Sequence, residues 1–168
     1  MKSDQLLLIG AGGFALAAFM AAKTKEKTSY DLGNIDPGNI SQQVDILART
    51  IWGEARGEGA QGMQAVANVV MNRAHNPGWW GHDVVSVCLA DQQFSAWNLN
   101  DANYSKIQAV TASDASFALA LQIAGRAVAG TLPDITGGAT HYHTAAVNPF
   151  WDDAMTYLGA IGRHLFYS

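Results

Sequence analysis

The stretch VDILARTIWGEARGE, residues 44–58, decides the first element of the fold. Its apolar residues recur at intervals of three and four positions, as one face of an α-helix requires: Val44, Leu47, Ala48, Ile51, Trp52 and Ala55. Upstream, Asn39 and Ser41 are candidate helix caps, and Gln42 follows Asn39 by three positions as in a capping box. We therefore expect a helix that begins near residue 39 and buries this apolar face.

Two further segments repeat the helical pattern. Residues 63–74 place Met, Val and Ala side chains on one face, and Asn76-Pro77-Gly78 ends that helix because proline and glycine interrupt helical backbone. A third helix is predicted from Asp114 to Val128, with Gly130 placed to end it.

The remaining segments are rich in glycine, amide and aromatic residues, which is typical of loops. A short terminal strand is predicted at His164 to Tyr167. The predicted fold class is mainly α, of the α+β kind: one small helical catalytic domain over residues 41–168, with a substrate groove built from loops.

The N-terminus has a different composition. Residues 6–22 are apolar and would form a helix about 26 Å long, slightly short of a hydrocarbon core of about 30 Å. A cleaved signal peptide, a permanent anchor and a glycine- and alanine-rich segment that inserts and later leaves the bilayer all stay open. We predict a membrane or signal-anchor helix over residues 1–22, contacting membrane through residues 6–22, and a polar linker over residues 23–40.

Composition excludes some classes of protein. The chain has 168 residues, of which 49% are hydrophobic and 14% charged, so it can bury a compact core. The net charge of −4 provides no electrostatic footprint for nucleic acid. Cys88 lies among apolar neighbours and is predicted to be a buried structural thiol. The oligomeric state stays open.

Glu54 is the main candidate for a catalytic carboxyl group. It lies just off the apolar stripe and near the predicted helix end, beside Ile51 and Trp52. Apolar surroundings raise a carboxyl pKa, and a group that protonates a glycosidic oxygen must keep its proton near neutral pH. Glu58 would share the face of Glu54 if the helix continued, but Gly57 argues against continuation. The alternative is that both glutamates are solvated helix residues.

Two groups of loop residues suit sugar binding, because amides and hydroxyls bond to sugar hydroxyls and aromatic rings stack on sugar C–H faces. The members of the two groups are Gln93, Ser95, Trp97 and Asn98, and Tyr142, Asn148 and Trp151. Each aromatic ring taken alone is more commonly a core residue. Two groups in glycine-punctuated loops favour a groove.

His141 and His143 allow a different chemistry. In a strand, residues i and i+2 point to the same side, as two ligands of one metal ion would. Together with Glu54 or Asp152 they would form a zinc site of an amidase or endopeptidase. The sequence has no His-Glu-x-x-His motif. On the main hypothesis no metal and no cofactor are needed, and His143 binds substrate.

Several blocks of sequence resemble the SleB/CwlJ-type cell wall hydrolases. They are ARTIWGEARGE at 48–58, GMQAVANVVMNR at 62–73, QFSAW at 93–97, GGATHY at 137–142 and IGRHLFY at 161–167. The resemblance spans roughly residues 44–168. It implies a lysozyme-like helical fold and lytic transglycosylase activity on peptidoglycan.

In such a mechanism one glutamate acts first as acid and then as base, and the family motif maps that role onto Glu54. The resemblance thus implies cleavage of the glycan strand between MurNAc and GlcNAc with no cofactor. The predicted substrate-binding residues are Glu58, Gln93, Ser95, Trp97, Tyr142 and His143. One departure is His141-Tyr142-His143-Thr144, where family members often have Tyr-Tyr-Asn-Pro, so the resemblance does not identify the polar group that binds substrate here.

A short catalytic domain behind an apolar segment resembles a bacteriophage lysin, acting in host lysis or as a virion component during entry. This analogy predicts a membrane-anchored protein that acts in the periplasm or cell wall. The lysines after residue 22 favour retention of the C-terminal side inside the cell, which conflicts with that location. A non-catalytic, membrane-anchored virion protein is the third hypothesis.

Overall fold

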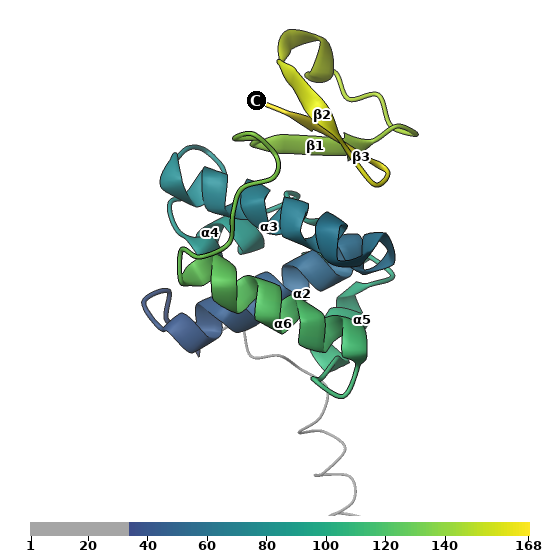
Figure 1. Ribbon diagram of the computed structural model, residues 1–168. Coiled ribbons are helices and arrows are strands. Elements are labelled where there is room, and N and C mark those ends of the chain that lie inside the picture. The colour runs from purple at the N-terminus through teal and green to yellow at the C-terminus, as the bar shows by residue number, and fades with distance from the viewer. Residues whose placement is uncertain (1–33) are drawn as a thin grey trace, which may run out of the picture.

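The computed structural model describes residues 34–168, a helical layer with a small sheet packed on one side of it (Figure 1). The α-helices are α2 (Ile40–Ala55), α3 (Gly59–His75), α4 (Val84–Leu89), α5 (Tyr104–Ala109) and α6 (Ala115–Val128). The strands are β1 (His141–Thr144), β2 (Tyr157–Ile161) and β3 (His164–Tyr167). Short 3₁₀ helices are η2 (Arg56–Glu58), η3 (Ser95–Trp97) and η4 (Asp152–Ala154).

Helix α2 forms as its sequence predicts. The Asn39 side chain caps it by accepting hydrogen bonds from the backbone N–H groups of Ser41 and Gln42, at 3.0 and 3.3 Å. The capping box is incomplete, because the Gln42 side chain accepts from the Asp36 N–H instead of from Asn39. The predicted apolar face is buried against α3 and α6, which makes α2 the centre of the helical layer.

Helix α3 lies between the other helices and the sheet (Figure 1). One face joins the main core through Met63, Val66 and Val70. The opposite face packs Ala65 and Val69 against residues of the C-terminal part, Ala139 and Phe166. A helix that is apolar on two sides can join two layers, and α3 has that role here.

The sheet has strand order β1-β3-β2, and both pairs are antiparallel. The predicted terminal strand is β3, which lies in the middle, with Tyr142 of β1 opposite Phe166. β2 was not predicted, because it contains Gly159 and is mostly exposed, so it lacks apolar alternation. Together these elements confirm the predicted fold class, mainly helical with a small β component.

Two short helices were also not predicted. Each has only six residues, too few for a periodic pattern to stand out. α4 depends on local capping, since Asp83 and Ser86 form a reciprocal capping box. Cys88 in this helix is fully buried, and burial raises the pKa of its thiol to about 12, which confirms a structural thiol.

The predicted membrane helix over residues 1–22 and most of the predicted linker lie outside the described residues. Within residues 34–168, no helix combines the length and apolar character that crossing a membrane requires. α2 begins at Ile40, directly before the predicted start of the catalytic domain at residue 41.

Candidate active site

Glu54 lies in the last turn of α2, and both oxygens of its carboxyl group have partners from distant segments. Oε1 accepts a hydrogen bond from the backbone N–H of Ala96 in η3, at 3.2 Å. Oε2 accepts one from the Tyr142 hydroxyl on β1, also at 3.2 Å. The fold thus brings residues of α2, η3 and β1 together at one carboxyl group.

Gly53 allows the approach of η3 to α2. A Cβ atom at this position would lie 2.6 Å from the Cβ of Ala96 and 3.0 Å from Cγ2 of Ile107, closer than carbon atoms approach. The absence of a side chain lets the backbone of η3 pack directly on the helix. As a consequence, the N–H of Ala96 reaches the neighbouring Glu54.

The pKa of Glu54 is raised above its ordinary value, mainly because burial disfavours the charged form. The bonds from Ala96 and Tyr142 lower the pKa, whereas the charge of Asp101 raises it. The indole N–H of Trp52 donates to the hydroxyl of Ser116 in α6, 2.7 Å away. The net result is a carboxyl group that keeps its proton to higher pH than an exposed glutamate.

Tyr142 is the second member of this centre. Burial and the neighbouring Glu54 raise the pKa of its phenol well above the ordinary value, so the hydroxyl stays neutral and acts as a donor. Its ring packs beside Phe166 and His164 of β3. The pairing of β1 with β3 therefore fixes the position of the Tyr142 hydroxyl.

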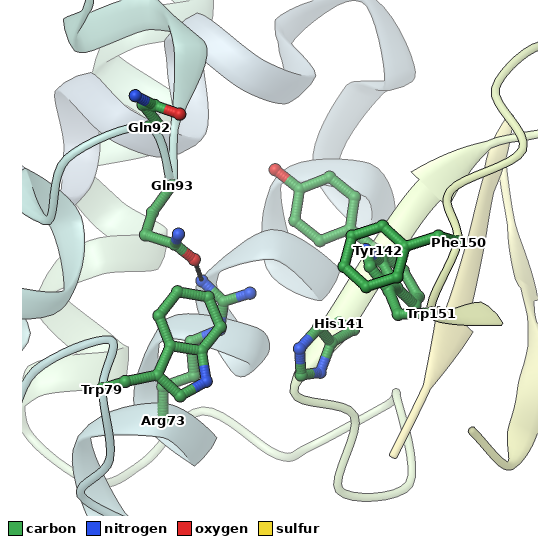
Figure 2. Close-up of a pocket in the computed structure, with 8 residues that line it drawn as sticks. All are labelled: Arg73, Trp79, Gln92, Gln93, His141, Tyr142, Phe150 and Trp151. Atoms are coloured by element: carbon green, nitrogen blue, oxygen red, sulfur yellow. Dashed lines mark hydrogen bonds between the residues drawn. The ribbon is translucent and has the colours of Figure 1, made fainter. Parts of the chain in front are cut away.

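A pocket of about 390 Å³ opens beside this centre (Figure 2). Figure 2 shows Trp79 on one side of it and the aromatic residues Phe150 and Trp151 on the other. Trp79 is 72% exposed and Phe150 is 97% exposed, which is unusual for large apolar side chains. Tyr142 lines the pocket and also bonds Glu54, so pocket and carboxyl group are adjacent. The lining residues are Arg73, Trp79, Gln92, Gln93, His141, Tyr142, Phe150 and Trp151.

The predicted sugar-binding residues of the 93–97 segment have different locations. Gln93 lines the pocket, and its Oε1 accepts a hydrogen bond from Nη1 of Arg73 at 3.2 Å. Ser95 is exposed in η3, next to the Ala96 amide that binds Glu54. Trp97 packs against the core, and its indole N–H donates to the buried hydroxyl of Thr50 at 2.9 Å. Trp97 is thus held within the fold and is not among the residues that line the pocket.

Glu58 lies in the 3₁₀ helix η2, so α2 does not continue to it, as the glycine at position 57 indicates. Its side chain is 9% exposed and pairs with Arg163 in the β2–β3 turn. The Arg163 backbone N–H also donates to Oε2, at 3.0 Å. Gly162 leaves room for this contact, since a Cβ there would lie 2.3 Å from Oε2 of Glu58. Glu58 therefore joins the α2–α3 junction to the sheet, and Arg163 already occupies both of its carboxylate oxygens.

We expect Glu58→Gln to lower the melting temperature at neutral pH. The hydrogen bonds and charge of Arg163 lower the pKa of Glu58, so its stabilising effect is present above the ordinary pKa of about 4.5. That effect is lost as the pH falls through the lowered pKa of the folded state. Thermal unfolding from pH 3 to 8 should show a difference between wild type and variant that shrinks toward pH 3. A difference that grows on acidification would contradict this role.

His143 is enclosed. Its Nε2 lies 3.0 Å from the Tyr167 hydroxyl and 3.7 Å from a carboxylate oxygen of Asp152, and its ring stacks on Tyr167. His141 and His143 both contact the ring of Trp151, as residues on one side of a strand can. In the part of the chain from residue 34 onward, no three His, Cys, Asp or Glu side chains gather as a metal site would require. Within the described residues, no third side chain joins His141 and His143 as a zinc ligand, and the His143 ring packs against Trp151 and Tyr167.

Four residues that line the pocket were not predicted as site residues: Arg73, Trp79, Gln92 and Phe150. Arg73 follows Val66 and Val70 on the buried face of α3, and a charged residue on an apolar stripe was an available signal. Phe150 is exposed in the segment between β1 and β2, where no pattern pointed to it. Gln92 adopts φ 59°, which is uncommon for a residue other than glycine and is frequent at functional sites.

A buried carboxyl group of raised pKa beside a pocket with exposed aromatic walls suits the acid step of carbohydrate cleavage. A family model described as Cell Wall Hydrolase matches residues 57–167. The chain belongs to the cell wall hydrolase family and is an enzyme, as its sequence predicts. The matched residues begin just after Glu54 and include Tyr142 and the pocket.

Individual relatives agree with this family. A spore cortex-lytic enzyme of Halalkalibacterium halodurans is 29% identical over 138 residues, which are 79% of this chain but only 37% of that protein. The catalytic domain of the Bacillus cereus SleB protein has a TM-score of 0.62 at 24% identity, covering 81% of this chain and 99% of that domain. The catalytic domain of a germination-specific lytic transglycosylase, SleB from Bacillus anthracis, has a TM-score of 0.54 at 23% identity, with coverages of 83% and 100%. At these identities the two structures establish a shared fold.

Proposed function

We propose that the protein cleaves the glycan strand of peptidoglycan between MurNAc and GlcNAc as a lytic transglycosylase, with Glu54 as the single acid and base. The observation that carries the proposal is the buried carboxyl group of raised pKa, bonded by Ala96 and Tyr142 beside an open pocket. No cofactor takes part in these steps. The spore cortex-lytic relative supports the substrate class.

The reaction needs two proton transfers. Protonated Glu54 gives its proton to the glycosidic oxygen while the bond from that oxygen to the anomeric carbon breaks. The C6 hydroxyl of the same muramyl sugar then attacks the anomeric carbon, and the Glu54 carboxylate takes the hydroxyl proton. The product is a 1,6-anhydro sugar, and Glu54 regains its starting state. The Ala96 N–H and the Tyr142 hydroxyl stabilise the carboxylate between the two transfers.

Hydrolysis is the second candidate reaction. It requires a second carboxylate near the acid. Asp101 is the acidic residue whose charge acts on Glu54, and its own pKa is lowered, mainly by a bond from the Asn103 backbone N–H. Mass spectrometry of fragments released from purified peptidoglycan separates the two reactions. Anhydro-muramic ends support transglycosylation, whereas reducing muramic ends that disappear with Asp101→Asn would establish hydrolysis.

Tyr142→Phe tests the proton-transfer centre. Loss of the hydroxyl removes a bond to the Glu54 carboxylate, so we expect kcat/KM to fall by about 10-fold or more. The same bond lowers the pKa of Glu54, so its removal raises that pKa further. The alkaline limb of the kcat/KM profile should therefore move to higher pH. Tyr157→Phe, at an exposed position on β2, is the matched control and should leave both values unchanged. A profile unmoved by Tyr142→Phe would separate Tyr142 from the acid.

The exposed aromatic residues of the pocket are proposed platforms for sugar rings. Trp79→Ala should weaken binding of glycan fragments by about 10-fold, because ring stacking is lost, and should leave stability nearly unchanged. Ile40→Ala, at another exposed apolar position in the first turn of α2, is the control. Binding is measured by titration of tryptophan fluorescence or by calorimetry. Equal losses in both variants would show that Trp79 has no specific role.

We further propose that the catalytic domain acts at the cell wall from a membrane tether formed by residues 6–22, in phage-mediated lysis or entry. The apolar, uncharged character of that stretch supports the tether. Membrane fractionation of the full chain and of a variant with two aspartates inside residues 6–22 tests it. Recovery of both proteins in the same fraction would contradict the tether.

A further inference from the structure

Arg73 is a buried cation whose immediate partners are all uncharged. It is 5% exposed in α3. Its Nε donates to the carbonyl oxygen of Thr140 at 2.7 Å, and its Nη1 donates to Oε1 of Gln93 at 3.2 Å. The guanidinium also lies over the rings of Trp80 and Phe94, at 5.7 and 5.6 Å. Thr140, Gln93 and the two rings orient this group without neutralising it.

A buried charge ordinarily has a partner of opposite charge, because removing an ion from water is costly. Within residues 34–168, the Arg73 guanidinium forms no ion pair with a carboxylate. Burial lowers the pKa of Arg73, yet an arginine side chain stays charged in proteins. A guanidinium has five N–H donors, and only Nε and Nη1 are used within the described residues.

The unused donors are on the pocket side. Figure 2 shows one guanidinium nitrogen turned to Gln93 and another directed toward the side where His141 and Tyr142 lie. Because Oε1 of Gln93 accepts from Arg73, the Nε2 amide group of Gln93 is left as a further donor at the pocket. His141 adds no second cation, since burial and the nearby Arg73 lower its pKa.

We propose that Arg73, together with the Gln93 amide, binds a carboxylate group carried by the muramyl side chain next to the cleaved bond. The planar fork of a guanidinium matches a carboxylate, which would also provide the missing opposite charge. The location fits, because Tyr142 lines this pocket and bonds the catalytic Glu54. The identity of the carrier rests on the proposed function. The carboxylate is that of the lactyl group or that of a peptide attached to it.

The test uses the full chain with Glu54→Gln, so that no probe is consumed. Three probes are compared by calorimetry: N-acetylmuramic acid, its uncharged lactyl amide, and N-acetylmuramoyl-L-alanyl-D-glutamate. We expect one acidic probe to bind on the order of 10- to 100-fold more tightly than the amide. Preference for the first acid identifies the lactyl carboxylate as the ligand, and preference for the third identifies the peptide. An amide that binds as tightly as both acids overturns the proposal.

A second comparison assigns the effect to Arg73. Arg73→Gln should remove the preference for the acidic probe and leave the affinity for the amide unchanged. Arg126→Gln, at an exposed arginine of α6 outside the pocket, should keep the preference. A preference that survives Arg73→Gln also overturns the proposal. Where Arg73→Gln fails to fold, the comparison of acid with amide on the parent protein decides alone.

The failure of this inference and the failure of the proposed function can be distinguished. Cleavage of peptidoglycan by the wild-type protein tests the reaction, whereas the binding comparison involves no turnover. Cleavage without a preference for carboxylate would reject this inference alone. A preference for carboxylate without cleavage would reject the proposed reaction alone.

Discussion

Replacing Glu54 by glutamine is expected to lower the rate of glycan cleavage by about 10²- to 10⁴-fold, the usual contribution of a positioned acid and base. The amide has no proton of suitable acidity to give to the glycosidic oxygen. It fits the same space, because its oxygen accepts from the Ala96 N–H and its amide nitrogen donates to the Tyr142 hydroxyl. The measurement is the rate of product release from purified peptidoglycan.

The stability of the Glu54→Gln variant provides the control. The pKa of Glu54 is raised in the folded state, so the folded protein holds this proton more tightly than the unfolded chain. Wild-type stability therefore declines as the pH rises from about 4.5 through the raised pKa, and the glutamine variant lacks this decline. We expect the variant to melt at the same temperature as wild type near pH 4 and at a higher temperature than wild type near pH 8. A folded variant with full activity would remove Glu54 from the mechanism.

Replacing Gly53 by alanine is expected to destabilise the protein by about 1–3 kcal/mol, as overpacking of a close contact does. The new Cβ would lie 2.6 Å from the Cβ of Ala96, so η3 must move away from α2. That movement carries the Ala96 N–H away from Glu54, and cleavage should slow as well. Urea unfolding gives the change in stability, and product release gives the change in rate.

Gly125→Ala is the matched control for this substitution. Gly125 also lies within a helix, α6, but a Cβ there meets nothing within 4 Å. Alanine favours helix more than glycine does, so this variant should gain about 0.5–1 kcal/mol. A loss of stability in Gly53→Ala and a gain in Gly125→Ala would establish that Gly53 is required for the close contact with η3, and not for backbone freedom. A stabilising Gly53→Ala would contradict the close approach of η3.

The helices were predictable because their signals are local. Periodicity and capping predicted the start of α2, including the N-cap Asn39, and the bounds of α6 nearly to the residue. For α3 the pattern predicted residues 63–74 of a helix that begins at Gly59. The sheet was harder to predict from the sequence, because strand pairing joins segments far apart in the chain and β2 has no apolar alternation. Only β3, with its buried aromatic residues, was predicted as a strand.

The same distinction applies to the active site, where local features were predictable and contacts between distant segments were not. Burial of Glu54 near a helix end followed from its helix, but its contacts with Ala96 and Tyr142 depend on how three segments meet. The sequence shows that residue 97 is aromatic, but it does not show that the Trp97 indole N–H donates a hydrogen bond to the Thr50 hydroxyl inside the fold. Glu58 is a similar case, because its partner Arg163 is distant in the sequence.

The position of β3 between β1 and β2 has a consequence for the timing of folding. β1, which carries Tyr142, pairs with β3, and β3 lies near the C-terminal end of the described chain. During synthesis, α2 and α3 can pack while residues 164–167 are still inside the ribosome. Tyr142 has no strand to hold it until those residues emerge. A nascent chain therefore completes its acid centre only after residues 164–167 have left the ribosome.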